Sequence, residues 1–509
     1  MLQFERKAFL RDVLLLGAAL SVLIVSALLA GLGGSSRMEA AVDVAFSGIV
    51  LLNVAILAYV FTAVRRRLPL LLFQATFNLL LLGRVYVTWL QHYDRRLELL
   101  EAASYRSLYL SFQILAISLL TVYLSYRAAG SLFRRKEVSL AREGARSILD
   151  NPTVPIIRQL SKWVMYVSSL ASFFSLANTI LFVLRNGYLT SFTETAGVPS
   201  IISRLSLLFA PSFAVFLATM PSAKQLRLPM CVYGVYMLAS LFTGRRNIIV
   251  CEIFMLALYF VLRDNLLPKG KRVLTGRLLA LVCVLGVGGV YLLQMVAYLR
   301  SGLQNTSSSL LGTLVSFVDS QGASFRVVVK TVDYLDHFDP SSSWRFLLFP
   351  LELFFNNNII TRTLFNTTPI EIVQTAEFAQ NTNNYAHVLT YLVNSSKYLR
   401  GEGFGTSYVG EAYVAFGIAG VIVISILIGV AFRFFATLLA RPWPVAALGL
   451  LAVKSFVYIP RSYALGWVTD VFNITYLCYI LGLYLAAQLL LFVGTHLRRA
   501  APPQAEVKA

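Results

Sequence analysis

The sequence predicts an all-α, polytopic membrane protein with about twelve transmembrane helices. Hydrophobic side chains make up 57% of the 509 residues and charged side chains only 13%, whereas soluble proteins carry about 25% charged residues. The mean hydropathy is +0.70, and long apolar stretches recur along the whole chain. These observations exclude a soluble globular enzyme and a disordered chain, because neither combines so few charges with so much apolar surface.

Each predicted span is an apolar stretch near the roughly 20 residues that cross the hydrocarbon core as a helix. Two stretches, 228–243 and 248–262, are shorter and predict a tilted, re-entrant-like hairpin around 243–248. The predicted stretches are 13–33, 42–63, 68–90, 105–125, 163–184, 201–220, 228–243, 248–262, 278–298, 408–432, 444–460 and 469–493.

Basic residues set the predicted orientation, because cytoplasmic loops retain Lys and Arg. With the N-terminus in the cytoplasm, most of the 44 Lys and Arg residues fall in cytoplasmic segments. Topology therefore explains the net charge of +20, and no nucleic-acid partner is needed. Both termini are predicted to be cytoplasmic. The first stretch is predicted to be a retained helix and not a cleaved signal peptide, since it is long and further spans follow it.

Two long connections define the predicted domain organisation. Residues 1–298 hold the first nine predicted spans, with a basic cytoplasmic loop at 126–162. Residues 299–407 form a large loop that the predicted topology places on the outer side, and a loop of that length between two spans is usually functional. Residues 408–493 hold the last three spans, and residues 494–509 form a cytoplasmic tail.

The cytoplasmic loop at 126–162 contains a basic stretch from Arg134 to Arg146. This stretch fits either a helix on anionic lipid headgroups or a solvated loop that only sets the topology.

The cysteines indicate neither disulfides nor a metal site. All four, Cys231, Cys251, Cys283 and Cys478, fall inside predicted spans, where a cysteine is usually a small buried hydrophobic residue. No His or Asp spacing typical of a metal site occurs in the outer segments. The sequence predicts no metal and no other cofactor.

The first part of the large loop predicts a helix with one charged face. Charged residues recur at helical spacing, and this pattern fits either a functional surface or the solvated side of an amphipathic helix. These residues are Asp319, Arg326, Lys330, Asp333 and His337.

Several ionisable residues lie inside predicted spans, where each costs about 2.5–3.5 kcal/mol at a helix centre. For each, the alternative to a functional role is an internal salt bridge or a side chain that reaches the interface. They are Arg84, Arg204, Glu252, Glu411 and Lys454.

The tip of the predicted hairpin carries two adjacent arginines, Arg245 and Arg246, on the outer side. This placement runs against the positive-inside bias, and guanidinium groups suit phosphate oxygens. Arg204 and Arg461 lie at outer ends of other predicted spans. We expect these four arginines to converge on a lipid pyrophosphate.

Small residues accumulate where the chain enters the membrane after the large loop. Gly403-Phe404-Gly405-Thr406-Ser407 is followed by Glu411-Ala412-Tyr413 and by Phe416-Gly417-Ile418-Ala419-Gly420. The glycines allow an irregular entry into the membrane, and non-helical backbone at that depth is tolerated only inside protein or beside water. Glu411 is therefore expected near a cavity or a cationic partner.

These motifs resemble those of the bacterial Wzy-type O-antigen polymerases. The family commonly shows a Gly/Ser-rich turn, a Glu-Ala-Tyr-like step and a Phe-Gly-x-x-Gly segment that enters a late transmembrane helix. The Gly244-Arg245-Arg246 turn and the large outer loop are also similar to the family pattern. The segment from Phe346 to Pro369 lacks the Pro- and Lys-containing pattern of the family, so the resemblance assigns no acceptor-side residue.

The resemblance implies a membrane glycosyltransferase of the bacterial inner membrane, with a GT-C-like architecture. Its substrate would be an oligosaccharide on undecaprenyl pyrophosphate, transferred en bloc to the next lipid-linked repeat unit at the periplasmic face. Its other implied partners are membrane lipid and a chain-length regulator protein.

The implied reaction needs cations for the leaving pyrophosphate and a base for the acceptor hydroxyl. Arg245, Arg246, Arg204, Arg461 and Arg326 are the expected cations. Tyr408 and Tyr413 offer rings for sugar stacking. The base candidates are Glu411, His387, Asp319 and His337, of which Glu411 and His387 rank first.

Three alternatives remain open at the level of sequence. A transporter or lipid-linked oligosaccharide flippase explains the spans equally well, although transporters often contain internal repeats and none is evident here. An O-antigen ligase would share the donor and the fold, and only the late motif favours a polymerase. A scaffold or polysaccharide-export anchor is the third alternative.

Overall fold

The computed structural model describes residues 2–133, 150–187, 197–244, 246–268, 272–274, 288–289, 291 and 309–500. Every regular element among these residues is a helix, and no strand occurs among them. The predicted all-α fold class is thus confirmed for the described part of the chain. Arg245, the basic stretch from Arg134 to Arg146 and most of the predicted span at 278–298 lie outside the described residues.

The N-terminal part of the chain consists of long helices joined by short turns. They are α1 (Leu2–Gly31), α2 (Ser35–Phe61), α3 (Val64–Phe77), the π-helix η1 (Asn78–Leu82), α4 (Gly83–Gln91), α5 (Arg96–Leu99), α6 (Tyr105–Leu132), α8 (Thr153–Asn186), α9 (Ser200–Ser206), α10 (Phe209–Ala218), α11 (Ala223–Ser240) and α12 (Arg246–Leu266).

The C-terminal part begins with short helices and ends with long ones. They are α14 (Leu310–Gln321), α15 (Phe325–Asp333), α16 (Arg345–Asn357), α17 (Ile359–Phe365), α18 (Ala376–Asn381), α19 (Tyr385–Val393), α20 (Ser395–Leu399), α21 (Tyr408–Phe435), α22 (Trp443–Val457), α23 (Gly466–Val471) and α24 (Ile474–Ala500).

Nine helical segments of the described residues are long and apolar enough to cross a membrane, and they correspond to nine of the predicted spans. The predicted span at 444–460 is α22, which has only 15 residues. The predicted span at 248–262 is α12, which is not among the nine. The nine segments are Leu10–Gly31, Ser35–Phe61, Val64–Gln91, Tyr105–Leu132, Thr153–Asn186, Ser200–Ala218, Ala223–Thr243, Tyr408–Phe435 and Gly466–His496.

Both helices of the 243–248 hairpin are longer than their apolar stretches. α11 continues into the 3-10 turn η4 (Leu241–Thr243), and α12 has 21 residues, about 31 Å at 1.5 Å per residue. α12 continues past its apolar stretch because its terminal charges are satisfied. Arg263 Nη2 donates to the carbonyl of Pro221 at 3.2 Å, and Asp264 accepts the backbone N–H of Val273 at 3.0 Å. Both helices of the hairpin are therefore longer than the stretches 228–243 and 248–262 that the sequence predicts.

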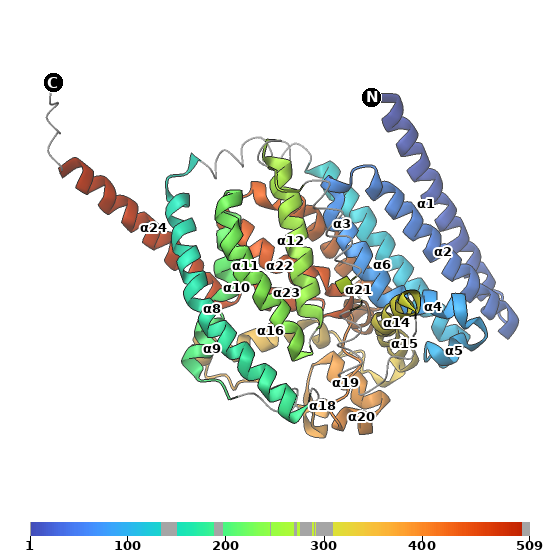
Figure 1. Cartoon of the computed structure of the whole chain (residues 1–509). Helices are drawn as coiled ribbons and strands as arrows, with labels where there is room; N and C mark the ends of the chain where they lie inside the picture. The colour runs from blue at the N-terminus through green and yellow to red at the C-terminus, as the bar shows by residue number, and fades with distance from the viewer. Residues whose placement is uncertain are drawn as a thin grey trace.

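The helix ends alternate between two ends of the molecule (Figure 1). The start of α1 and the last turns of α24 lie at one end, and α18, α19 and α20 of the large loop lie at the opposite end. The predicted topology, with both termini on one side of the membrane and the large loop on the other, stays a prediction.

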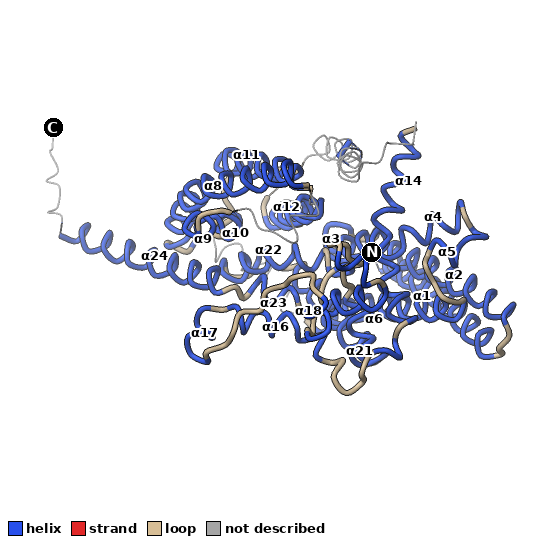
Figure 2. The backbone as a smooth tube through the Cα atoms, turned by 90° about the horizontal axis from the view of Figure 1, so that it is seen from below, coloured by secondary structure: helices blue, strands red, loops and turns tan. Residues whose placement is uncertain are grey.

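The long helices form two groups, and the C-terminal helices join them (Figure 2). One group contains α8 to α12 and the other contains α1 to α6. α21 packs along α6, whereas α22 packs on α10 and α12. The late motif therefore lies on a helix that contacts the N-terminal group and leads directly into the second group.

The first helices of the large loop are embedded against the N-terminal group. α14 packs on α4, and α15 packs on α6. The crossing is so close that a Cβ atom at Gly322 would lie 1.9 Å from the backbone nitrogen of Arg84. The buried ring of Phe325 lies 5.6 Å from that of Phe112. The predicted helical character of this region is confirmed, with a 3-10 turn, η6 (Gly322–Ser324), between α14 and α15.

α21 is irregular where the sequence predicts an irregular membrane entry. Phe416 and Gly417 have non-helical backbone angles, and Gly417 has φ +58°. After this kink the chain turns back on itself, so that a Cβ atom at Gly420 would lie 2.2 Å from the carbonyl oxygen of Ala412. The Phe-Gly-x-x-Gly segment thus needs glycine at both positions.

Candidate functional site

Glu411 is fully buried in the first turn of α21. Its Oε1 accepts a hydrogen bond from the Thr406 hydroxyl at 2.5 Å, and its Oε2 accepts one from the backbone N–H of Ala464 at 2.8 Å. The carboxyl group therefore joins the Gly-rich turn before α21 to the turn between α22 and α23. The sequence predicts a cavity or a cationic partner beside Glu411. In the structure, two neutral groups donate hydrogen bonds to its carboxyl group instead.

The turn that carries Ala464 is held by the large loop. The neighbouring Tyr463 donates its hydroxyl proton to Asn384 Oδ1 at 2.8 Å. Burial, followed by the nearby Glu411 carboxyl, raises the pKa of the Tyr463 hydroxyl. The side-chain amide nitrogen of Asn384 and the hydroxyl of Ser407 are buried without a hydrogen-bond partner among the described residues. Unsatisfied polar atoms thus lie beside the elements that enclose Glu411.

α19 contacts the start of α21 directly. The buried hydroxyl of Tyr385 is hydrogen-bonded to Thr331 of α15. A Cβ atom at Gly410 would lie 3.0 Å from that hydroxyl, so the small residue before Glu411 allows this approach. The large loop therefore covers the first turn of α21 through both α15 and α19.

His387 lies on α19, two residues beyond Tyr385, in an aromatic environment. Its Nδ1 is 2.8 Å from the hydroxyl of Tyr398, and its ring lies edge-on to Phe378 at 5.1 Å. Burial lowers the pKa of His387 to about 4. The imidazole is therefore neutral at pH 7 and is a weak proton acceptor there.

The depressed pKa of His387 predicts a pH-dependent stability. An unfolded histidine binds a proton near pH 6.5, so the contribution of neutral His387 is fully present above that pH. It is lost as the pH falls from about 6.5 toward 4. We expect the thermal unfolding midpoint of the full chain in detergent to fall between pH 7 and pH 5.

We expect His387→Gln to reduce this fall in the unfolding midpoint, because glutamine does not titrate. His337→Gln is the matched control, since His337 is an exposed histidine of the same loop. An equal fall in the wild type and in His387→Gln would contradict the expectation.

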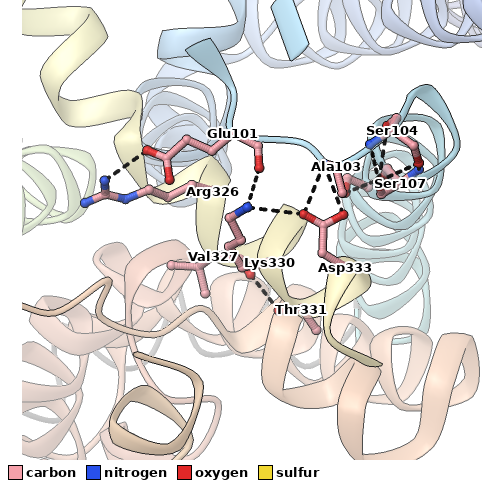
Figure 3. Close-up of polar contacts among 10 residues, drawn as sticks. Glu101, Ala103, Ser104, Ser107, Arg326, Val327, Lys330, Thr331 and Asp333 are labelled. Carbon is pink, nitrogen blue, oxygen red and sulfur yellow. Dashed lines mark hydrogen bonds and ion pairs between the residues drawn. The ribbon is translucent and has the colours of Figure 1, made fainter. Parts of the chain in front are cut away.

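The charged face of α15 binds the connection between α5 and α6 (Figure 3). Arg326 pairs with Glu101 at 3.3 Å, and Lys330 Nζ donates to the Glu101 carbonyl at 2.6 Å. Asp333 accepts the backbone N–H of Ala103 at 3.3 Å, just before α6 begins. The face is therefore partly exposed, and its charged residues fix the large loop to the N-terminal group.

Asp319, a candidate base, also forms an ion pair with the N-terminal group. Its Oδ2 lies 3.2 Å from Nη2 of Arg84 on α4. Arg326, an expected substrate cation, is paired with Glu101, and its guanidinium also lies 4.8 Å from the ring centre of Phe404. Asp319 and Arg326 are thus each neutralised by a residue of the N-terminal group, so neither charge requires a substrate as its partner.

The expected pyrophosphate cations are only partly placed. Arg246 begins α12, and Arg204 is exposed on α9. Arg461 is partly buried in the 3-10 turn η9 (Ile459–Arg461). It shares this connection with Ala464, so of these arginines it has the closest described link to Glu411.

The two candidate stacking residues differ in position. Tyr408 is fully buried, and its hydroxyl is hydrogen-bonded to Ser118 of α6 at 2.6 Å. Its ring offers no surface to a sugar, so the expected stacking role of Tyr408 does not fit the structure. Tyr413 is only partly buried and retains exposed surface.

Two of the charges inside predicted spans neutralise each other. Lys454 Nζ on α22 lies 2.9 Å from Glu252 Oε1 on α12. An internal salt bridge was one of the two expected explanations for both residues, and this contact joins the hairpin to the C-terminal helices.

An apolar groove of about 450 Å³ reaches the turn that carries Ala464. α21, α22 and α23 supply its walls, and the side chains that line it are almost entirely apolar. They include Ile428, Phe435, Phe456, Ala464, Trp467 and Val471. One end of the groove is thus bounded by the residue whose N–H binds Glu411.

Sequence reasoning missed the residues that enclose Glu411. Thr406 is part of the Gly-rich motif, but the motif does not predict that its hydroxyl binds Glu411. Asn384 and Tyr463 carry no local pattern, and Ala464 contributes only its backbone N–H. No group of three or more His, Cys, Asp or Glu side chains suited to a metal ion occurs among the described residues.

Comparison with known proteins gives one result. No curated protein matches the chain, and no solved structure matches it. The profile of the O-antigen polysaccharide polymerase Wzy matches residues 18–491, nearly the whole chain. The chain therefore belongs to the O-antigen polymerase Wzy family.

Proposed function

We propose that this protein polymerises undecaprenyl-pyrophosphate-linked repeat units at the periplasmic face of the bacterial inner membrane. Membership of the Wzy family makes it a multi-pass membrane protein of O-antigen polymerisation that acts on lipid-linked oligosaccharide. The growing glycan is the donor, and the next lipid-linked repeat unit is the acceptor. A chain-length regulator is the proposed protein partner.

The observation that carries this proposal is the buried carboxyl group of Glu411 under the Gly403–Ser407 turn. A polymerase needs a group that accepts the proton of the acceptor hydroxyl. In the proposed step, Glu411 takes this proton while the hydroxyl oxygen attacks the anomeric carbon of the donor. The bond between that carbon and the pyrophosphate oxygen breaks, and undecaprenyl pyrophosphate leaves.

For this step the Gly-rich turn must move, because Glu411 has no exposed surface in the present conformation. Gly405, with φ +78°, lies in the left-handed region that favours glycine and lies next to Thr406. Breaking the single hydrogen bond from Thr406 would free Oε1 and leave Oε2 held by Ala464. Glu411 would then keep its orientation while one oxygen faces the substrate.

The apolar groove supports a lipid-linked substrate. Removing apolar surface from water contributes about 25 cal/mol of binding free energy per Å². A polyprenyl chain in a membrane is already out of water, so its binding to protein depends on van der Waals packing instead. The groove offers such packing along α21 and α22, and its end at Ala464 lies beside Glu411. A chain bound there would hold its pyrophosphate near Arg461.

The test of the proposal is incubation of the purified full-length protein with a lipid-linked repeat unit, with the products separated on a gel. A ladder of regularly spaced glycans is the expected result. Transfer to lipid A core without a ladder would indicate a ligase instead. Unchanged substrate that crosses the bilayer of reconstituted vesicles would indicate a flippase.

We predict that Arg245→Ala and Arg246→Ala each reduce long-chain glycan about 10- to 100-fold, since a hydrogen bond to a charged group contributes about 1.5–3 kcal/mol. The measurement is the glycan length distribution of cells at equal protein levels. Arg362→Ala is the control, because Arg362 is an exposed arginine of the large loop. Wild-type chain lengths in both hairpin variants would remove the pyrophosphate assignment.

A further inference from the structure

A shallow pocket of about 480 Å³ lies on the large loop, along one face of α16. The hairpin arginines and the Glu411 carboxyl are not part of it. Trp344, Arg345, Glu352, Phe355, Asn356 and Asn383 line the pocket together with aliphatic side chains. Their positions along α16 follow helical spacing, so one face of this helix presents both aromatic and polar groups.

Two aromatic rings in the pocket are exposed and fixed in place. Trp344 is 40% exposed and Phe355 is 42% exposed. The indole N–H of Trp344 donates to the carbonyl of Ser341 at 3.1 Å, which orients the ring. Phe355 lies 5.5 Å from Phe365 of α17, which supports it from behind. Such rings give flat apolar contact area at little entropic cost.

The polar groups of the pocket retain unused hydrogen-bonding capacity. Glu352 Oε2 accepts from Asn383 Nδ2 at 2.9 Å, and no described residue donates to its Oε1. Asn356 uses its amide N–H on the carbonyl of Glu352 at 3.0 Å, which leaves its side-chain oxygen available. The guanidinium of Arg345 forms no hydrogen bond or ion pair with the described residues. The pocket thus offers acceptors and a donor around two flat rings.

This combination suits a pyranose ring. A sugar presents a flat C–H face, which packs on aromatic rings, and a rim of hydroxyl groups, each of which donates and accepts hydrogen bonds. Glu352 and Asn356 can accept from hydroxyls, and Arg345 can donate to them. An acyl chain would use the rings but would give no hydrogen bond to Glu352 Oε1 or to the Arg345 guanidinium.

The pocket is linked to the Glu411 site through a short chain of contacts. Asn383 precedes Asn384, which accepts from Tyr463 at 2.8 Å. Phe349 of α16 also lies 6.0 Å from the Tyr463 ring. The residue after Tyr463 is Ala464, which binds Glu411. α16 is therefore held against the same turn that positions the proposed base.

We propose that this α16 pocket binds a sugar ring of the lipid-linked glycan. The identity of the glycan as an O-antigen repeat unit rests on the proposed function. In the complex, the sugar packs on Trp344 and Phe355, a hydroxyl donates to Glu352 Oε1, and Arg345 donates to a second oxygen. The pocket positions the glycan, and Glu411 remains the residue that takes the proton.

The test is a binding measurement on the purified full-length protein by isothermal titration calorimetry. The probe is a single repeat-unit oligosaccharide, released from its lipid by mild acid, so that no lipid contributes to affinity. We expect Trp344→Ala and Glu352→Gln each to raise the Kd about tenfold. Glu377→Gln should keep the wild-type Kd, because Glu377 is an exposed carboxylate of α18 that does not line the pocket.

An unchanged Kd in both pocket variants, or the absence of binding to the wild type, would overturn the proposal. This result is distinct from failure of the proposed function. Glu411→Gln should bind the oligosaccharide like the wild type, because Glu411 does not line the pocket. If the pocket variants weaken binding while the wild type makes no ladder from lipid-linked substrate, the pocket stands and the polymerase assignment fails.

Discussion

Replacing Glu411 by glutamine is expected to reduce the rate of polymerisation about 10²- to 10⁴-fold, the usual contribution of a general base. Glutamine has nearly the same size, its amide oxygen can still accept the hydrogen bond from the Ala464 backbone N–H, and its amide N–H can donate to the Thr406 hydroxyl oxygen. It cannot accept a proton from a sugar hydroxyl. The measurement is the initial rate of ladder formation by purified protein on a lipid-linked repeat unit, at a fixed concentration of folded protein.

A purely structural role of Glu411 would give a different pattern. The variant would then unfold at lower temperature, and activity would be lost in proportion to folded protein. A base gives a rate loss at an unchanged unfolding midpoint and removes the acidic limb of the pH–rate profile. Glu402→Gln is the matched control, because Glu402 is an exposed carboxylate in the same segment. A wild-type rate for Glu411→Gln would exclude it as the base.

The sequence was sufficient to propose Glu411 as a candidate base, but it could not predict the atoms that hold its carboxyl group. The motif places a carboxylate after a Gly-rich turn, at a depth where charge is costly, and this is local information. Its partner Ala464 is distant in the sequence and contributes a backbone N–H, which every residue except proline carries. No side-chain pattern can reveal such a partner.

The charged face of α14 and α15 illustrates a second limit. Helical periodicity predicted that Asp319 and Arg326 share one face of a single helix, whereas the 3-10 turn η6 divides this segment, so that Asp319 lies on α14 and Arg326 on α15. Periodicity identifies a face but not what the face contacts, and Arg84 and Glu101 lie more than two hundred residues away in the chain. The sequence allowed this side to be either solvated or functional, and the structure shows partly exposed ion pairs that join it to the N-terminal group.

Tyr408 and Tyr413 show how helix geometry separates residues that look equivalent in a motif. Residues five apart on an α-helix point about 140° away from each other. When Tyr408 is directed at Ser118 on α6, Tyr413 must lie on another side of α21. The sequence does not indicate which side meets α6, because all sides of this helix are apolar.

The ion pair between Lys454 and Glu252 predicts a large effect on stability. Glu252→Leu would leave the Lys454 ammonium without its partner at 2.9 Å inside the helix bundle. Removal of one partner of a fully buried pair costs about 3–5 kcal/mol, because the remaining charge is not compensated, and the 21% exposure of the Lys454 side chain makes the expected loss here smaller. We expect a clear fall in the unfolding midpoint of the purified protein, measured in the same detergent as the wild type.

The double variant Glu252→Leu/Lys454→Met separates the ion pair from packing. It removes both charges and keeps apolar side chains of similar size, so it should recover most of the stability lost in Glu252→Leu. If the double variant recovers the stability of the wild type, the ion pair contributes little net stability. Its role would then be to specify that α12 packs against α22. If the single variant is as stable as the wild type, the ammonium reaches solvent, and α12 and α22 do not enclose it as the structure indicates. If the double variant is as unstable as the single one, the loss comes from packing around Glu252 and not from the unpaired charge.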